Sequence, residues 1–379
     1  MAGRRGNNEG NIKKRSDGRW EARVSLPNGK RKSVYGRTRA DVAAKMTAVM
    51  KSAQDGVPVP NERITVGRYL DEWFAGHKGG IRHSTSRRYE QLIRIHLQPH
   101  LGRHRLASLT VRHINTAYGE MLAAGSAART IRQAHAVLSK AFRDADMNRM
   151  ISHNPVQYAK PPKVEDPSVA TLDEAQARQL LNAVAGSRME ALFVLATAHG
   201  LRQGELLGLR WPDLNLETGI LTVRVQLQAV RTSREAPAVW QLVAPKTKQA
   251  RRSIRLSDTA RQALVVHKAR QAEERLGLGP AWDTSWNLVF PNTIGRPMDG
   301  GNLTDRYFAP ALAAAELPRI RFHDLRHTCA TLLLKNQVPL KVVSEMLGHR
   351  DPAYTLRLYQ HVLPDMQKQA AHAVDQLFG

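Results

Sequence analysis

The chain has 379 residues, with 57 Lys or Arg against 33 Asp or Glu, so its formal net charge is +24. That length predicts two or three domains at roughly 100–200 residues each, and a hydrophobic content of 42% argues against a disordered chain. A single cysteine, Cys329, excludes a disulfide framework and a cysteine-rich zinc site. No apolar run approaches the roughly 18 residues of a membrane helix, and the basic start lacks a signal peptide's apolar segment. We therefore expect a cytoplasmic protein with no membrane partner.

The excess positive charge is concentrated in the first part of the chain. Residues 1–60 carry 14 basic and 5 acidic side chains, and residues 61–163 carry 17 and 7, so 19 of the 24 excess charges precede residue 164. Lys and Arg gain affinity for phosphates by releasing condensed counterions. The pattern favours a front half that grips nucleic acid, with ribosome association as the simpler alternative.

Short strands and one helix are predicted for residues 10–58. Residues 20–26 alternate in polarity, residues 27–30 resemble a turn, and residues 31–35 return as a second strand. From residue 39 the period changes, and Val42, Met46, Val49 and Met50 share one helical face. A small basic sheet of this kind can enter a DNA groove. The candidate DNA contacts here are Arg19, Arg23, Lys30, Arg31 and Lys32.

A linker at residues 55–60 leads to four predicted helices, centred on residues 70–74, 89–96, 111–122 and 131–142. Thr110 is the expected N-cap of the third helix. Basic side chains on the outer faces of these helices can contact a duplex, although each one taken singly is more often solvated surface. The candidates chosen for DNA binding are Arg87, Arg88 and Arg132.

A second linker, residues 154–167 with four prolines, precedes the largest block. Residues 171–174 resemble a capping box, and residues 191–198 form an apolar helix. Residues 219–230 and 238–256 are predicted strands, with a hairpin turn at 245–249, and Pro339 is expected at the first position of a later helix. The amphipathic tail, residues 364–379, is expected to dock on its own or a neighbouring catalytic domain.

Five short motifs follow one another in this last block: Gly-Leu-Arg-x-x-Glu from residue 200, Lys-Thr-Lys from 246, His-Asp-Leu-Arg-His from 323, Leu-Gly-His from 347 and Tyr-x-His from 359. In this order they resemble the tyrosine recombinase family of the phage-integrase type. The resemblance implies a mainly α multidomain fold with small β-sheets: an arm-type DNA-binding domain of sheet plus helix (1–58), a helical SAM-like core-binding domain (61–160) and a mixed α+β catalytic domain with a C-terminal tail (165–379).

The resemblance also implies a catalytic set, which comprises Arg202, Lys246, His323, Arg326, His349 and Tyr359, with Glu205 in support. A tyrosine can store phosphodiester energy as a phosphotyrosyl ester. Two arginines match the charge that develops on the nonbridging oxygens. A lysine on a hairpin tip suits protonation of the leaving 5′ oxygen, and histidines can bond the phosphate or help to activate the tyrosine. No step calls for a metal or cofactor.

Rival interpretations exist for single residues. His323 and His327 have the spacing of a zinc metalloprotease motif, but Asp324 stands where a longer Glu is required and Arg326 would repel the cation. Tyr354 is a rival nucleophile, yet it lies about 140° around a helix from Tyr359, whose Tyr-x-His context is preferred. Cys329 is expected to be buried without a chemical role.

We therefore expect a site-specific recombinase, an integrase of a phage or genomic island, acting at the nucleoid of a bacterial host. Its expected partners are double-stranded DNA at attachment sites and three further copies of the chain, with a host DNA-bending protein and an excisionase as accessory factors. Alternatives are a chromosome or transposon resolvase of the same family, a catalytically silent DNA-binding regulator, and a type IB topoisomerase-like enzyme that acts alone.

Overall fold

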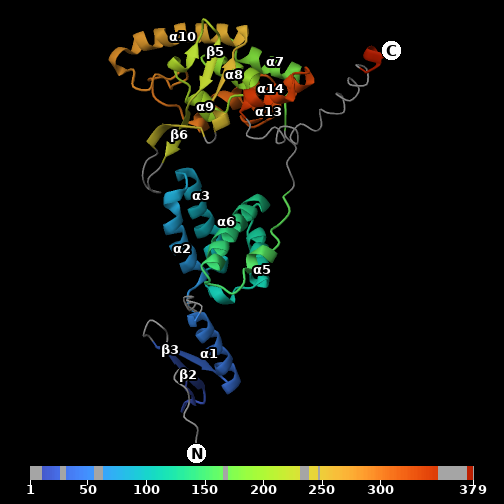
Figure 1. Cartoon of the computed structure of the whole chain (residues 1–379). Helices are drawn as coiled ribbons and strands as arrows, with labels where there is room; N and C mark the ends of the chain where they lie inside the picture. The colour runs from blue at the N-terminus through green and yellow to red at the C-terminus, as the bar shows by residue number, and fades with distance from the viewer. Residues whose placement is uncertain are drawn as a thin grey trace, which may run out of the picture. The chain divides into compact units, whose positions relative to one another are not determined.

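A computed structural model describes residues 11–25, 31–54, 63–164, 170–230, 239–245, 248–348 and 374–378 of the chain (Figure 1). The chain divides into two compact units, residues 1–166 and 167–379. Several predicted features lie outside the described residues: the turn at 27–30, the linker at 55–60 and most of the tail. So do five of the singled-out side chains: Lys30, Lys246, His349, Tyr354 and Tyr359.

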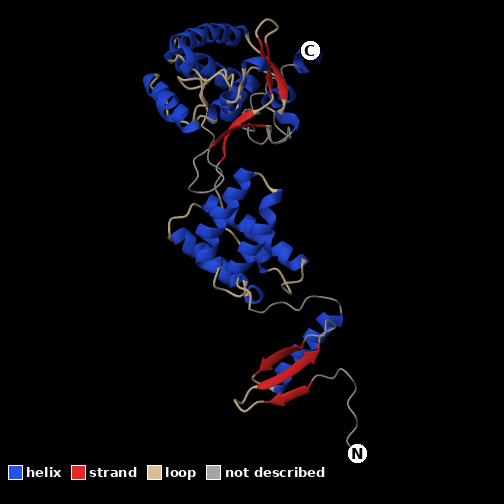
Figure 2. Ribbon diagram, turned by 90° about the vertical axis from the view of Figure 1, so that its left-hand side faces the viewer, coloured by secondary structure: helices blue, strands red, loops and turns tan. Residues whose placement is uncertain are grey.

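The first unit begins with a three-stranded antiparallel sheet and a helix, which Figure 2 shows packed on one sheet face. The strands are β1 (Asn11–Lys14), β2 (Trp20–Ser25) and β3 (Arg31–Gly36), in that order, and the helix is α1 (Arg39–Gln54). The predicted helical face is confirmed, because Val42 and Val49 are buried against the sheet and Met46 and Met50 pack beside them. A core this small holds the sheet and its helix together.

The rest of the first unit is helical (Figure 1). All four predicted helices are present, as α2 (Val66–His77), α3 (His83–Leu92), α5 (Val111–Ala123) and α6 (Ala128–Met147). A π-helical turn at Ile93–Leu97 and the short helix α4 (Gln98–Leu101) continue α3. The predicted cap is confirmed: the Thr110 Oγ1 accepts the His113 N–H at 3.3 Å, and the His113 Nδ1 accepts the Thr110 N–H at 3.3 Å. One apolar face of each long helix closes the core.

The described residues of the second unit form two small sheets. The first has the order β4 (Leu214–Asn215), β5 (Ile220–Val223), β8 (Arg252–Arg255), and the second pairs β6 (Gln226–Val230) with β7 (Val239–Val243). The two long predicted strands therefore each break into two. The prediction of a hairpin turn at 245–249 is wrong, since β7 pairs with β6 and β8 pairs with β5. Strands β7 and β8 therefore belong to different sheets.

Helices surround these sheets. They are α7 (Glu174–Ala183), α8 (Glu190–His199), α9 (Gln203–Leu207), α10 (Asp258–Leu278), α11 (Gly300–Leu303), α12 (Ala309–Ala314), α13 (Asp324–Lys335) and α14 (Leu340–Leu347). The apolar helix α8 is buried on nearly every side and contacts α7, α10 and α13. Pro339 is the N-cap of α14 rather than its first residue. None of the helices within the described ranges is long and apolar enough to cross a membrane.

Candidate active site

A tight turn after α8 starts the site. Gly200 ends the helix in the left-handed conformation, with φ of 61°, and a Cβ there would lie 2.5 Å from the Leu347 Cδ2. Only glycine allows helices α8 and α14 to approach this closely. Arg202 follows as the N-cap of α9, and Glu205, three residues later, accepts its backbone N–H at 3.1 Å. The sequence Gly-Leu-Arg-x-x-Glu thus encodes a turn and a helix start at which Glu205 accepts from both the backbone and the side chain of Arg202.

Arg326 reaches the same place from helix α13. Its residue is only 3% exposed, and its guanidinium donates from Nη1 to the Gly200 carbonyl at 2.8 Å and from Nη2 to the Leu347 carbonyl at 2.5 Å. A buried guanidinium must be hydrogen-bonded to offset its lost hydration. Gly200 and Leu347, which carry these carbonyls, lie well over a hundred residues apart in the sequence. Arg326 therefore joins the end of α8 to the end of α14.

The last carbonyls of α14 are held by three arginines from three elements. The Met346 carbonyl accepts from Arg252 Nε at 2.5 Å, the Leu347 carbonyl from Arg326, and the Gly348 carbonyl from Arg202 Nη2 at 3.3 Å. The final carbonyls of a helix have no partner within it, and cations favour this end of the helix dipole. Gly348 caps the helix in the left-handed conformation, with φ of 67°. This turn directly precedes His349 in the sequence.

Glu205 is the carboxylate at the centre of this group. Its side chain is 1% exposed and pairs with Arg202 Nη1 at 2.7 Å and with Arg252 Nη2 at 3.0 Å. Burial alone raises the pKa of Glu205, but Arg252 first and Arg202 second outweigh it and hold that pKa below its usual value. Glu205 is therefore ionised at neutral pH, and two guanidinium groups share one negative charge.

His323 stands at the N-cap of α13, and part of the residue faces solvent. The protein atoms around its ring, followed by His327, Arg326 and Arg202, lower the pKa of His323 to about 4. At neutral pH its imidazole is therefore uncharged. The His327 ring lies edge-on to it at 5.2 Å between centroids, and Asp324 is bonded to Arg321. Among the described residues, no three His, Cys, Asp or Glu side chains group closely enough to hold a metal ion.

The fold thus brings together four of the seven predicted site residues: Arg202, Glu205, His323 and Arg326. Arg252 joins them and was not predicted. Its signal in the sequence was present but ambiguous, because Arg251 and Arg252 follow the Lys-Thr-Lys motif as two of several neighbouring basic residues. Only the strand register and the position of Glu205 distinguish one from the other. Cys329, as expected, is buried; its Sγ contacts the Ala198 carbonyl at 3.3 Å.

The predicted DNA contacts on the small sheet do not all share one face. Arg23 lies opposite Ser33 and Ser25 lies opposite Arg31, whereas Lys32 pairs with the buried Val24 on the side that α1 covers. Cross-strand partners lie on the same face of a sheet. Arg23 and Arg31 therefore belong to the face away from the helix, and Lys32 does not.

That open face is organised around Glu21, which is buried although it is charged. Arg23 Nε donates to Glu21 Oε1 at 3.0 Å, Arg15 and Lys13 approach its other oxygen at 3.5 and 3.9 Å, and the Arg15 guanidinium lies 5.7 Å from the Tyr35 ring centre. One carboxylate thus aligns several cations on the sheet. Arg19 lies just before β2 and pairs with Asp17.

Three predicted contacts lie on the helical part of the first unit. Arg87 and Arg132 are exposed. Arg88 is half-buried and donates from Nε and Nη2 to the Gln133 side chain at 2.9 and 2.6 Å, which ties α3 to α6. Arg88 therefore has a structural contact that the other two lack in the described part of the chain.

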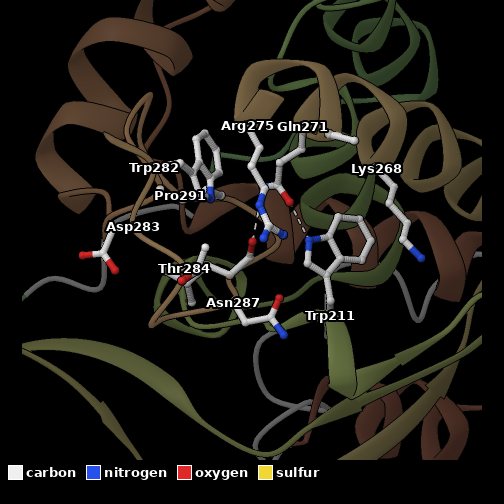
Figure 3. A pocket seen from close by; sticks show the side chains of 12 residues that line it. Trp211, Lys268, Gln271, Arg275, Trp282, Asp283, Thr284, Asn287 and Pro291 are labelled. Carbon is white, nitrogen blue, oxygen red and sulfur yellow. Dashed lines mark hydrogen bonds between the residues drawn. The ribbon is translucent and has the colours of Figure 1, made fainter. Parts of the chain in front are cut away.

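A pocket of about 280 Å³ lies elsewhere in the second unit (Figure 3). Trp211 and Trp282 line it together with Arg275 and Lys268, and the Lys268 ammonium is 5.6 Å from the Trp211 ring centre. The Trp211 indole N–H donates to Gln271 at 2.6 Å, which fixes the ring. Of the catalytic candidates that the structure describes, Arg202, His323 and Arg326 do not line this pocket, so it is separate from the arginine cluster.

Comparison with known proteins supports one family. Residues 170–366 match the family model described as "Phage integrase family", and residues 65–122 match the one described as "Phage integrase, N-terminal SAM-like domain". A "Tyrosine recombinase XerC-like" protein of Caldanaerobacter subterraneus is 30% identical over 368 residues, which cover 93% of each chain. An "Integrase" of Streptomyces ambofaciens is 29% identical and covers 100% of this chain and 98% of its own.

Solved structures share the fold. The Tn1549 transposon integrase in complex with a circular intermediate DNA has a TM-score of 0.67 at 23% identity, over 81% of this chain and 99% of that one. A lambda integrase tetramer bound to a Holliday junction has a TM-score of 0.56 at 21% identity, over 94% and 96%. With its motifs, its arginine cluster and its catalytic-domain match all in agreement, the chain belongs to the phage integrase family and is a site-specific tyrosine recombinase of the phage or mobile-element type.

Proposed function

We propose that the protein cleaves and rejoins DNA at attachment sites through a phosphotyrosyl link between Tyr359 and the 3′ phosphate, with a Holliday junction between the two strand exchanges. One observation carries this proposal: Arg202 and Arg326, which lie far apart in the sequence, meet at the end of α14 beside His323. Such a cluster of cations in a low-dielectric setting is suited to a scissile phosphate.

Each group then has a chemical role. Arg202 and Arg326 hold the nonbridging oxygens, because guanidinium groups stay charged and offer paired donors in a fixed plane. Lys246 donates a proton to the 5′ oxygen as it leaves, and His349 bonds the phosphate or helps to deprotonate Tyr359. Glu205 supports Arg202 without touching DNA. The low pKa of His323 makes it a neutral hydrogen-bond partner in the free protein, and a nearby phosphate would raise that pKa.

The front half supplies the grip on DNA. We assign residues 1–58 to an arm-type DNA-binding domain, residues 61–160 to a core-binding domain and residues 165–379 to the catalytic domain with its tail. The open sheet face with Arg23 and Arg31, and the exposed Arg87 and Arg132, support contacts to phosphates. Arg19 and Lys30 extend the same basic segment.

Recombination of two sites calls for four protomers. A lambda integrase has been crystallised as a dimer on a core site and as a tetramer on a Holliday junction, and we propose the same homotetramer on two synapsed sites here. A host DNA-bending protein and an excisionase would assist at the nucleoid of a bacterial cell. Integration of a mobile element into a chromosome is the process that this set of parts suits.

A covalent-trapping assay tests the proposal. Wild type, Tyr359→Phe and Tyr354→Phe are incubated, without metal or ATP, with nicked suicide duplexes made from the DNA that flanks the gene. A denaturing protein gel should show a protein–DNA adduct for wild type and Tyr354→Phe, and none for Tyr359→Phe. An adduct that survives Tyr359→Phe would refute the assigned nucleophile. Binding without any adduct would instead favour a regulator that has lost its chemistry.

A further inference from the structure

Arg252 is a buried arginine in the site with no assigned role. It begins strand β8, its side chain is 6% exposed, and four hydrogen bonds hold its guanidinium. Nε donates to the Met346 carbonyl at 2.5 Å and Nη1 to the Ala250 carbonyl at 3.1 Å. Nη1 and Nη2 donate to the two oxygens of Glu205 at 3.2 and 3.0 Å. Protein oxygens thus accept hydrogen bonds from all three guanidinium nitrogens.

Arg252 and Arg202 both bind the carboxylate of Glu205. Each oxygen of Glu205 accepts one N–H from Arg252, and from Arg202 one oxygen accepts a guanidinium N–H and the other the backbone N–H. Arg202 therefore makes only a one-point guanidinium contact with Glu205. Without Arg252, both carboxylate oxygens would be available for the two-point pairing that arginine and carboxylate prefer. Arg202 could then pair with Glu205 through two guanidinium N–H groups, which would no longer be available to a phosphate.

The same side chain also fixes the turn before His349. Besides its bond to Met346, Arg252 packs so closely against Gly348 that a Cβ there would lie 3.0 Å from the Arg252 Cδ. Arg202 binds the carbonyl of that same glycine. One guanidinium thus touches both the partner of Arg202 and the backbone that Arg202 contacts. In the sequence, β8 also follows the Lys-Thr-Lys motif within a few residues.

We propose that Arg252 is a positioning residue for DNA cleavage: it shares the Glu205 carboxylate with Arg202 and anchors the end of α14, so that the Arg202 guanidinium is correctly placed for the scissile phosphate. The inference rests on the proposed function, because it concerns how fast the Tyr359 adduct forms. It assigns Arg252 no contact with DNA.

The test measures the single-turnover rate of adduct formation on the same nicked duplexes at saturating protein. The proteins compared are wild type, Arg252→Met, Arg252→Lys, Glu205→Gln and the double variant that combines Arg252→Met with Glu205→Gln. Loss of a residue that orients a catalytic group costs about 10- to 100-fold in rate, and we expect Arg252→Met to fall in that range while its DNA affinity in a gel shift stays within about threefold of wild type. Arg252→Lys keeps the charge but not the planar fork, so its rate should be intermediate.

The double variant separates positioning from bulk stability. If Arg252 acts through Glu205, its replacement should slow cleavage much less when Glu205→Gln is already present. Equal slowing in both backgrounds would overturn the proposal, as would a wild-type rate for Arg252→Met or for Arg252→Lys. Should Arg252→Met not fold, Arg252→Lys and the double variant still test the proposal. The double variant has no buried Glu205 charge that lacks its Arg252 partner.

Arg210→Met is the matched control. Arg210 also pairs with a buried carboxylate, Asp213, at 3.0 Å, and Arg224 shares that carboxylate at 3.4 Å, without contact to α14. Its cleavage rate should stay near wild type. Absence of a Tyr359-dependent adduct in the wild type would overturn the proposed function itself. A Tyr359-dependent adduct with no effect of Arg252 would overturn this inference alone.

Discussion

Replacing Gly200 by alanine tests how the turn after α8 sets the site. The backbone there has φ of 61°, a region that costs a residue with a Cβ about 1–2 kcal/mol. The new methyl would also lie 2.5 Å from the Leu347 Cδ2 and 3.3 Å from the Cys329 Sγ. Overpacking of a core adds about 1–3 kcal/mol. Gly200→Ala should therefore lower the free energy of unfolding of the catalytic unit by about 2–5 kcal/mol.

The control is Gly186→Ala. Gly186 has a similar φ of 70° in the same unit, but a Cβ there would meet nothing within 4 Å, so it should cost only the backbone share of about 1–2 kcal/mol. Urea denaturation followed by tryptophan fluorescence reports on this unit, because four of the six tryptophans lie between residues 211 and 286. Equal losses for the two variants would refute the steric argument.

The clash also has a consequence for chemistry. Arg326 donates to the carbonyl of Gly200 and to that of Leu347, so a displaced α14 would move the end of the helix that three arginines share. Gly200→Ala should slow adduct formation even at temperatures where the protein stays folded, whereas Gly186→Ala should not. Unchanged cleavage by folded Gly200→Ala would show that the turn matters for stability alone.

Three further predictions concern charge. Burial lowers the pKa of His199 to about 4, below the unfolded value of about 6.5. The stability that neutral His199 contributes is therefore complete above pH 6.5 and is lost as the pH falls towards 4. In urea titrations over this range, wild type should lose up to about 3 kcal/mol more of its free energy of unfolding than His199→Gln. Sulfate should raise the melting temperature more than chloride at equal ionic strength, partly by its general exclusion from protein surface and partly because it can occupy the arginine cluster, and Arg202→Gln should reduce the difference. Arg87→Gln and Arg132→Gln should each reduce the salt dependence of binding to a random duplex by a slope of about one, whereas Arg178→Gln, an exposed arginine of α7 that pairs with Glu174, should leave it unchanged.

Local patterns predicted the elements that depend on near neighbours in the chain. The face of α1 and the Thr110 cap follow from the spacing of side chains within one helix. The break in the two long strands could not be found this way. It depends on which strand pairs with which, and β5–β8 pairing joins residues about thirty positions apart.

The candidate site was predictable by motif but not by geometry. The motifs point to Arg202 and Arg326, yet nothing in their spacing indicates that both bind carbonyls of one helix end. Arg252 was missed because its contacts with Glu205 and with the end of α14 form only when β8, α9 and α14 pack together. Lys32 was grouped with Arg23 and Arg31, since the register that places it on the opposite face is a property of the folded sheet.

The three-arginine cap on α14 also bears on engineering. Its donors come from α9, β8 and α13, and they converge on consecutive carbonyls of residues 346–348. A substitution in any of these elements would therefore alter the contacts of the other two, and single changes there cannot be optimised independently. Efforts to redirect the enzyme to new target sequences should leave these elements untouched and vary the sheet face and the outer surfaces of the helical domain, where side chains such as Arg87 and Arg132 make few contacts within the protein.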